Sequence, residues 1–271
     1  MTDIFGKLLD PLKNKKVFLL DMDGTIYLDR LVIDGTYEFL SKVKAMDKKV
    51  MYITNNSSRS VQAYLNKLQT LGIDAKKEDF YTSSMAMTTY LLKFYRHKKV
   101  YCMGTKSLIE ELLFNGINVT TEPSDDVEII VLGYDTELTY QKLFDVSSLL
   151  KNRNIIYLAT NIDNTCPTEF GFVPDCGSMA IMLEIATGRK PKFIGKPDPM
   201  MIYESIKISG LNNEDAVIVG DRLHTDILSG INAGVDTVCV LTGESTLEDI
   251  LSSNIKPTYV TPSIKVLAEI L

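Results

Sequence analysis

Short apolar runs of strand length alternate with segments of helical periodicity along nearly the whole chain. The predicted strands cover residues 17–20, 50–53, 100–103, 129–132, 155–158, 193–194, 216–219 and 237–241. The predicted helices cover residues 37–46, 61–71, 108–115, 140–151, 178–186, 200–209 and 227–233, and several of them end at a glycine. Strands that alternate with helices are typical of parallel sheets with helices on both faces, so we predict an α/β protein.

Polar side chains stand at the ends of four of the predicted strands. They are Asp21, Thr54, Lys196 and Asp221. Ligands of doubly wound sheets bind off the carboxyl ends of the strands, so these residues are candidates for the functional site. Predicted strands and helices also alternate between residues 79 and 188, but there the residues that directly follow the strands include no charged side chain. We therefore predict two lobes, a core of residues 1–84 and 186–271 and an inserted lobe of residues 85–185.

The composition is that of an ordinary globular protein large enough for two domains. The chain has 271 residues, of which 45% are hydrophobic and 24% charged, which excludes a disordered or fibrous polypeptide. Its formal net charge of -6 argues against a nucleic-acid partner, because a polyanion needs a basic surface. A small anionic substrate is still compatible with this charge, since a bound cation and a few backbone amides reverse the local field.

Neither the cysteines nor the apolar runs indicate a secreted or membrane protein. Cys102, Cys166, Cys176 and Cys239 lie far apart without CxxC spacing, so we expect reduced thiols rather than a zinc ribbon or a redox pair. No apolar run approaches the roughly 20 residues that span a bilayer. The N-terminus lacks the pattern of a signal peptide. We therefore expect a cytoplasmic protein with no membrane partner.

Two carboxylates lie one residue apart where the first predicted strand ends. Asp21 and Asp23 occupy positions i and i+2, which project to the same side of an extended segment, so their charges repel. A bound cation or a shared proton relieves this repulsion, and an oxygen-rich site favours Mg²⁺. A calcium loop is excluded because Gly24 is the fourth residue counted from Asp21 rather than the sixth. The alternative interpretation is a polar turn that caps the next element.

Acidic residues also follow the strand predicted at residues 216–219. Asp221 stands directly past the strand end, where it could ligate the same ion. Asp226 is expected in the first turn of the next helix, which Thr225 can cap, and there it could hold a metal-bound water or orient a lysine. Alternatively, Asp226 interacts only with the helix dipole. We expect His224 to be a solvated loop residue rather than a catalyst.

A hydroxyl and a run of backbone amides follow the strand predicted at residues 50–53. Thr54 and the turn at residues 55–58 can cradle phosphate oxygens, although a plain strand-to-helix loop with Ser and Asn caps explains the same residues. Lys196 is held between Gly195 and Pro197, and only this fixed loop distinguishes it from an ordinary solvated lysine. Neither segment identifies a function alone.

Taken together, these segments resemble a known family. Asp21-Met22-Asp23-Gly24-Thr25, Thr54-Asn55, Lys196 and Gly220-Asp221 with Asp226 occur in the order of the four motifs of the haloacid dehalogenase (HAD) superfamily. Residues 54–59, 186–191, 195–197 and 230–234 resemble its NagD-like branch, which includes 4-nitrophenyl phosphatase-like and phosphoglycolate phosphatase-like enzymes. The resemblance spans nearly the whole chain. It implies a Rossmann-like, doubly wound parallel-sheet core with a large α/β cap inserted between the second and third motifs, which agrees with the two predicted lobes.

The resemblance implies a Mg²⁺-dependent phosphatase. Asp21 would be the nucleophile that becomes an aspartyl-phosphate, and Asp23 the general acid and then the general base. Lys196 and Mg²⁺ would neutralise charge, and Thr54 would bind a phosphoryl oxygen. The implied metal ligands are Asp21, Asp23 through its backbone carbonyl, Asp221 and Asp226. The implied substrate-binding residues of the same region are Gly24, Asn55 and Asn56.

The inserted lobe is expected to select the substrate. The resemblance implies that its specificity loop is residues 160–169, which makes Asn161, Asp163 and Cys166 candidate substrate contacts. For Cys166 the simpler interpretation is a small thiol that only fills space. The loop has little cationic character, which favours small, neutral leaving groups and hence a permissive phosphomonoesterase for small phosphorylated metabolites. In relatives, caps of this kind take part in dimer contacts, which implies a homodimer through the cap. Two alternatives stay open, a receiver-type signalling domain and a catalytically silent relative that binds a phosphorylated ligand.

Overall fold

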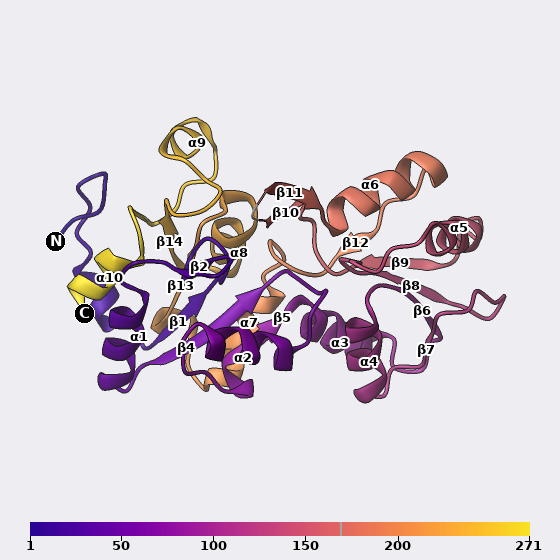
Figure 1. Cartoon of the computed structure of the whole chain (residues 1–271), viewed down its shortest axis with the longest axis horizontal. Coiled ribbons are helices and arrows are strands. Elements are labelled where there is room, and N and C mark those ends of the chain that lie inside the picture. The colour runs from indigo at the N-terminus through magenta and orange to yellow at the C-terminus, as the bar shows by residue number, and fades with distance from the viewer. Residues whose placement is uncertain (169) are drawn as a thin grey trace. The chain divides into compact units, whose positions relative to one another are not determined.

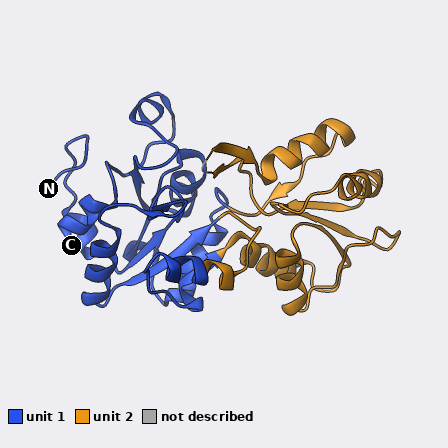
Figure 2. Ribbon diagram, viewed as in Figure 1, with its two compact units in different colours: residues 1–54, 65–81, 196–271 blue, residues 55–64, 82–195 orange. Residues whose placement is uncertain are grey.

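The computed structural model describes residues 1–168 and 170–271, which divide into two compact units (Figure 2). Unit 1 consists of residues 1–54, 65–81 and 196–271, and unit 2 of residues 55–64 and 82–195. These edges differ from the predicted ones at residues 85 and 185. One reason is that the strand at residues 192–193 pairs with the strand at residues 156–159 inside unit 2, so the segment before Lys196 belongs to the inserted lobe.

Among the described residues, unit 1 contains a six-stranded sheet. Its strands are β1 (Val17–Leu20), β4 (Lys49–Thr54), β5 (Phe80–Thr82), β13 (Ala216–Gly220), β14 (Asp236–Val240) and β15 (Tyr259–Thr261). Their order across the sheet is β15-β14-β13-β1-β4-β5, of which all except β15 are labelled in Figure 1. The pairs from β15 to β4 are all parallel. This is the 3-2-1-4-5-6 order of doubly wound sheets, in which the winding reverses between β1 and β13. The predicted core architecture is confirmed.

The strands on either side of this reversal are completely buried. All residues of β1 and β13 are apolar or glycine, as expected for central strands that helices cover on both faces. Leu20 pairs with Val219 of β13 and with Tyr52 of β4. The three strands therefore end at the same edge of the sheet, and the polar residues that follow them lie there together.

Helices flank the sheet of unit 1. They are α1 (Thr36–Ala45), α2 (Val61–Thr70), α7 (Met200–Ser209), α8 (Leu228–Ala233), α9 (Leu247–Ser252) and α10 (Ile264–Ile270), with 3₁₀ helices η1 (Asp10–Asn14), η2 (Lys77–Asp79) and η3 (Asn213–Asp215). Helix α1 packs against α10 and α7 against α8, while α1 and α7 both contact β4. A short hairpin of β2 (Tyr27–Leu28) and β3 (Leu31–Val32) connects β1 to α1.

Unit 2 has a parallel sheet of its own. Its strands are β6 (Val100–Met103), β7 (Val119–Thr120), β8 (Ile129–Leu132), β9 (Ile156–Ala159) and β12 (Lys192–Phe193), in the order β12-β9-β8-β6-β7. Its helices are α3 (Ser83–Phe94), α4 (Lys106–Phe114), α5 (Tyr140–Leu149) and α6 (Cys176–Thr187). An antiparallel pair, β10 (Thr165–Thr168) and β11 (Gly171–Pro174), precedes α6. The strand order is the 2-1-3-4-5 order of flavodoxin-like sheets, so the inserted lobe is an α/β layer structure as expected.

The hydrophobic pattern does not reveal every element. Helix α3 has buried Ser83, Ser84 and Thr88 beside its apolar residues, so it lacks the polar face that helical periodicity requires. Strands β5 and β15 have three residues each, which is too short for a recognisable period. The elements that were predicted from longer patterns are confirmed to within a few residues.

The four cysteines are free, and Cys102, Cys176 and Cys239 are buried while Cys166 is partly exposed. Free thiols agree with the expectation from their spacing. Within the described part of the chain, no helix combines the length and the apolar character needed to cross a bilayer.

A glycine at the start of α1 provides a test of the packing in unit 1. Gly35 has a φ of +87°, and a Cβ at this position would collide with the backbone of Lys265 in α10. We expect Gly35→Ala to lower the free energy of unfolding by about 2–4 kcal/mol, because left-handed strain and overpacking add. At Gly234, φ is +70° and nothing lies within 4 Å of an added Cβ. Gly234→Ala should therefore cost only about 1–2 kcal/mol.

Urea unfolding followed by far-UV circular dichroism measures both losses. Equal losses in the two variants would contradict the close packing of α1 on α10.

Candidate active site

A buried lysine joins two carboxylates at the edge where the central strands end. Lys196 is 1% exposed, and its Nζ donates to Oδ1 of Asp21 at 2.6 Å and to Oδ1 of Asp226 at 2.6 Å. It also lies 3.3 Å from the carbonyl oxygen of Ile53 at the end of β4. The loop that holds Lys196 between Gly195 and Pro197 thus places its positive charge where the strand order of the sheet reverses. Ordinary solvation is excluded for this lysine.

Three carboxylates surround this part of the site. One oxygen from each of Asp21, Asp221 and Asp226 lies within 4.8 Å of the others. Burial raises the pKa of Asp21 well above its usual value, and repulsion from Asp226 and Asp221 adds to the rise while Lys196 opposes it. Burial also raises the pKa of Asp221 to about 7, with repulsion from Asp226 as the second cause. Three carboxyl groups therefore lie close to a single lysine.

The pKa of Lys196 changes in the opposite sense to that expected from burial. Burial alone lowers the pKa of an ammonium group, but Asp21 and Asp226 outweigh this effect and raise the pKa of Lys196 above its usual range. The lysine is therefore fully protonated at neutral pH and supplies a permanent positive charge.

The donor set fits a divalent cation. Oδ2 of Asp221 accepts a hydrogen bond from the Glu244 amide at 2.7 Å, whereas its Oδ1 is buried with no hydrogen-bond partner. A buried carboxylate oxygen without a partner is costly, and a hard cation bound by oxygen ligands removes that cost. Asp21, Asp221 and Asp226 could hold Mg²⁺ in this way.

The loop after β14 completes the site, and sequence analysis missed it. A Cβ on Gly243 would collide with the Asp221 carboxylate, and a Cβ on Gly24 would lie 2.6 Å from Oδ2 of the same residue. The hydroxyl of Thr242 donates to the carbonyl oxygen of Gly24 at 2.6 Å. Thr242-Gly243 directly after the strand predicted at residues 237–241 is the only signal that could have indicated this role.

The turn before α8 differs from the prediction. Leu223–Ile227 form a π-helical turn, and Thr225 lies inside it rather than at a helix N-cap. The expectation that Thr225 caps this helix is wrong, because the wider turn moves the start of α8 to Leu228. The same turn directs Asp226 toward Lys196, and Oδ2 of Asp226 accepts from the Arg222 amide at 3.1 Å. His224 is half-exposed and lies outside the carboxylate cluster.

Asp23 stands apart from the three clustered carboxylates. The hydroxyl of Tyr27 donates to its Oδ2 at 3.2 Å, and Nζ of Lys67 lies 3.4 Å from its Oδ1. Its side chain is 35% exposed. Both implied roles, acid–base catalysis through the side chain and metal binding through the backbone carbonyl, stay predictions.

Known proteins resemble this chain in sequence and in fold. Residues 18–118 match the family described as haloacid dehalogenase-like hydrolase, and residues 193–267 match a second, HAD-hydrolase-like family. The chain is 36% identical to an acid sugar phosphatase of Staphylococcus aureus over 248 residues, which are 92% of this chain and 95% of that protein. It belongs to the haloacid dehalogenase-like hydrolases.

Solved structures place this HAD hydrolase in the NagD-like branch. A 4-nitrophenylphosphatase from Thermotoga maritima superposes with a TM-score of 0.89 at 36% identity, covering 96% of this chain and 98% of that one. A putative NagD protein gives 0.87 at 34% identity, covering 94% and 98%. The glycerol phosphate phosphatase of Mycobacterium tuberculosis, in complex with magnesium, gives 0.88 at 30% identity, covering 95% and 77%. The chain is therefore an HAD-type phosphatase.

Three of the candidate substrate residues, Asn55, Asn161 and Asp163, form a buried hydrogen-bonded network within unit 2. Nδ2 of Asn55 donates to Oδ2 of Asp163 at 2.7 Å, and Nδ2 of Asn161 donates to the same oxygen at 3.1 Å and to Oδ1 of Asp175 at 3.0 Å. The side chain of Asn56 accepts from the amide and hydroxyl of Ser58. These contacts fix the loops that carry the residues.

The remaining residues of the predicted specificity loop lie in or near β10. Cys166 is partly buried in that strand, and residue 169 lies outside the described residues. Contact of Asn55, Asn56, Asn161, Asp163 and Cys166 with substrate stays a prediction.

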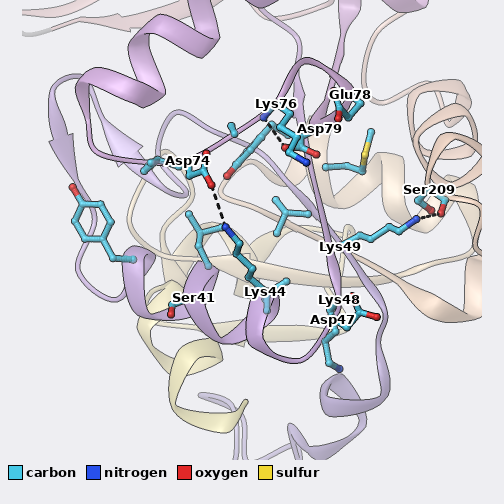
Figure 3. Close-up of a pocket in the computed structure, with 18 of the residues that line it drawn as sticks. Ser41, Lys44, Asp47, Lys48, Lys49, Asp74, Lys76, Glu78, Asp79 and Ser209 are labelled. Carbon is cyan, nitrogen blue, oxygen red and sulfur yellow. Dashed lines mark hydrogen bonds and ion pairs between the residues drawn. The ribbon is translucent and has the colours of Figure 1, made fainter.

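A separate pocket of about 630 Å³ lies near the start of β4, within unit 1 (Figure 3). Two of its lysines are engaged: Lys44 pairs with Asp74 at 3.1 Å, and Lys49 donates to the Ser209 carbonyl at 2.7 Å. None of the clustered carboxylates lines it. Because doubly wound sheets bind ligands at the opposite, carboxyl ends of their strands, this pocket is not the active site of the hydrolase.

The fit of the carboxylate cluster to Mg²⁺ can be tested without measuring activity. We expect MgCl₂ to raise the Tm of the protein, because an ion that binds only the folded state at 100 times its Kd contributes about 2.7 kcal/mol. Asp221→Asn should abolish the rise, since the amide keeps an acceptor for the Glu244 amide but removes the anionic ligand. Differential scanning calorimetry measures the Tm, and NaCl at equal ionic strength is the control. An unchanged Mg²⁺ response in Asp221→Asn would exclude this residue as a ligand.

Proposed function

We propose that this phosphatase is a Mg²⁺-dependent phosphomonoester hydrolase that acts on small phosphorylated metabolites through an aspartyl-phosphate intermediate. The observation that carries the proposal is the 2.6 Å contact between the buried Lys196 and the partly buried Asp21, beside Asp221 with its unpartnered oxygen. A carboxylate that attacks a phosphate dianion needs positive charge close to both groups, and this arrangement supplies it.

The first step transfers the phosphoryl group to Asp21. An oxygen of its carboxylate forms a bond to phosphorus while the bond from phosphorus to the ester oxygen breaks. Lys196 holds Oδ1 of Asp21 and favours the ionised nucleophile in spite of its burial. When bound, Mg²⁺ would neutralise the carboxylates and the phosphate. Asp23 gives its proton to the leaving oxygen, so the alcohol departs neutral.

The second step releases phosphate and restores the enzyme. Asp23, now ionised, takes a proton from a water molecule, and the water oxygen bonds to phosphorus. The bond between phosphorus and the Asp21 oxygen breaks, which returns Asp21 to its carboxylate form. Thr54 is 5% exposed at the end of β4, where its hydroxyl can bind a phosphoryl oxygen in both steps.

Two observations support small, neutral leaving groups. Residues 160–169 contain no Lys or Arg, so the loop offers no partner for a further negative charge on the substrate. The relatives include an acid sugar phosphatase and a glycerol phosphate phosphatase, whose names indicate polyhydroxy leaving groups. We propose sugar and polyol phosphates as the substrate class, with broad tolerance within it.

Phosphate release from 4-nitrophenyl phosphate and from a panel of sugar and polyol phosphates tests the reaction. We expect turnover that requires Mg²⁺ and stops with EDTA, with no substrate preferred by more than about 100-fold in kcat/KM. Asp21→Asn should abolish turnover because it removes the nucleophile. Asp23→Asn should lower kcat/KM for the polyol phosphates by about 10²–10⁴-fold.

The matched control is Asp74→Asn, which removes an exposed carboxylate paired with Lys44 in the same unit and should leave the rate unchanged. Turnover by Asp21→Asn at the rate of the unaltered protein would rule out the aspartyl-phosphate route.

A further inference from the structure

We propose that Lys67 and Tyr27 are positioning residues that hold the Asp23 carboxyl group outside the metal-ligand cluster, so that it serves as the acid and base instead of as a further ligand. The inference rests on the proposed phosphatase mechanism and assigns two residues that lie outside the four sequence motifs.

Each oxygen of the Asp23 side chain has its own partner. The Tyr27 hydroxyl donates to Oδ2 at 3.2 Å, and the Lys67 ammonium group lies 3.4 Å from Oδ1. Tyr27 belongs to β2 and Lys67 to α2, so two elements far apart in the sequence hold one carboxyl group. A carboxyl group held through both oxygens has little rotational freedom about its last side-chain bond.

The two partners also fix one another. Nζ of Lys67 lies 3.8 Å from the centre of the Tyr27 ring, which is the geometry of a cation–π contact. The Tyr27 side chain is completely buried, and its carbonyl oxygen accepts from the Gly24 amide at 2.8 Å. The ring is thereby anchored to the same turn that carries Asp23. Lys67 and Tyr27 form a rigid support rather than two independent surface contacts.

This support explains why neighbouring carboxylates separate into two groups. Residues two apart in an extended segment project to the same side. This geometry would direct the carboxyl groups of both Asp21 and Asp23 toward the metal-ligand cluster. The clustered set contains Asp21, Asp221 and Asp226 but not Asp23. The left-handed turn at Gly24, with φ of +85°, and the contacts to Tyr27 and Lys67 keep the second carboxyl group aside.

The role of Asp23 as an acid depends on the leaving group, and this gives a specific test. An alkoxide such as that of glycerol must be protonated as it leaves, whereas 4-nitrophenolate is stable as an anion and needs little help. Loss of correct positioning should therefore impair glycerol phosphate far more than 4-nitrophenyl phosphate. A general loss of structure would impair the two substrates equally.

The experiment measures kcat/KM for glycerol phosphate and 4-nitrophenyl phosphate in Lys67→Met and Tyr27→Phe. In each variant we expect kcat/KM to fall by about tenfold or more for glycerol phosphate and by less than about threefold for 4-nitrophenyl phosphate. Asp23→Asn should show the same imbalance in a stronger form. The Mg²⁺-induced rise in Tm should persist in both variants, because their metal ligands are intact.

Lys7→Met is the matched control, since Lys7 also lies over a tyrosine ring of unit 1, with its Nζ 4.5 Å from the centre of Tyr259, but outside the site. Lys7→Met should leave kcat/KM unchanged for both glycerol phosphate and 4-nitrophenyl phosphate. Equal losses for both substrates, or no loss, in Lys67→Met and Tyr27→Phe would overturn the positioning role while leaving the phosphatase proposal intact. If the unaltered protein with Mg²⁺ releases no phosphate from either substrate, the proposed function itself fails.

Discussion

Repulsion among three closely spaced carboxylates is the constraint on which the rest of this protein depends. Asp21, Asp221 and Asp226 lie close together with one lysine between them, and one oxygen of Asp221 has no hydrogen-bond partner. Such a cluster is unfavourable by itself, because burial and like charges both disfavour ionisation. It becomes favourable when a cation enters and neutralises these charges. The electrostatic cost of this cluster in the folded protein therefore favours the binding of a cation.

The fold supplies the rigidity that keeps these charges together. Completely buried β1 and β13 deliver Asp21 and Asp221 to one edge of the sheet, and the π-helical turn before α8 brings Asp226 to the same lysine. Glycines at positions 24 and 243 let two loops approach Asp221 more closely than any side chain would permit. The second unit contributes differently, because its buried amide and carboxylate network fixes the loops at Asn55 and Asn161.

Much of this arrangement could be predicted from the sequence, and the reasons for the failures are physical. Short apolar runs and amphipathic helices that end at glycine are recognisable from the local sequence, so the alternating α/β architecture was predicted correctly. The three-residue strands, helix α3 with its buried serines, and the loop at Gly243 carry no such period. The cap expected at Thr225 was wrong because a π-helical turn has no distinct signature in residue type.

The sequence by itself determined which chemical groups are available and at which strand ends they stand, because hydrophobic periodicity is a local property of the chain. Only the tertiary structure decided which of the carboxylates lie together and which one is held apart. Three carboxylates gather around Lys196, while Asp23 is held aside by Tyr27 and Lys67. Lys67 looks like any other helix lysine in the sequence. Its role depends on contacts between segments far apart in the chain, and distances across space are set by packing rather than by local pattern.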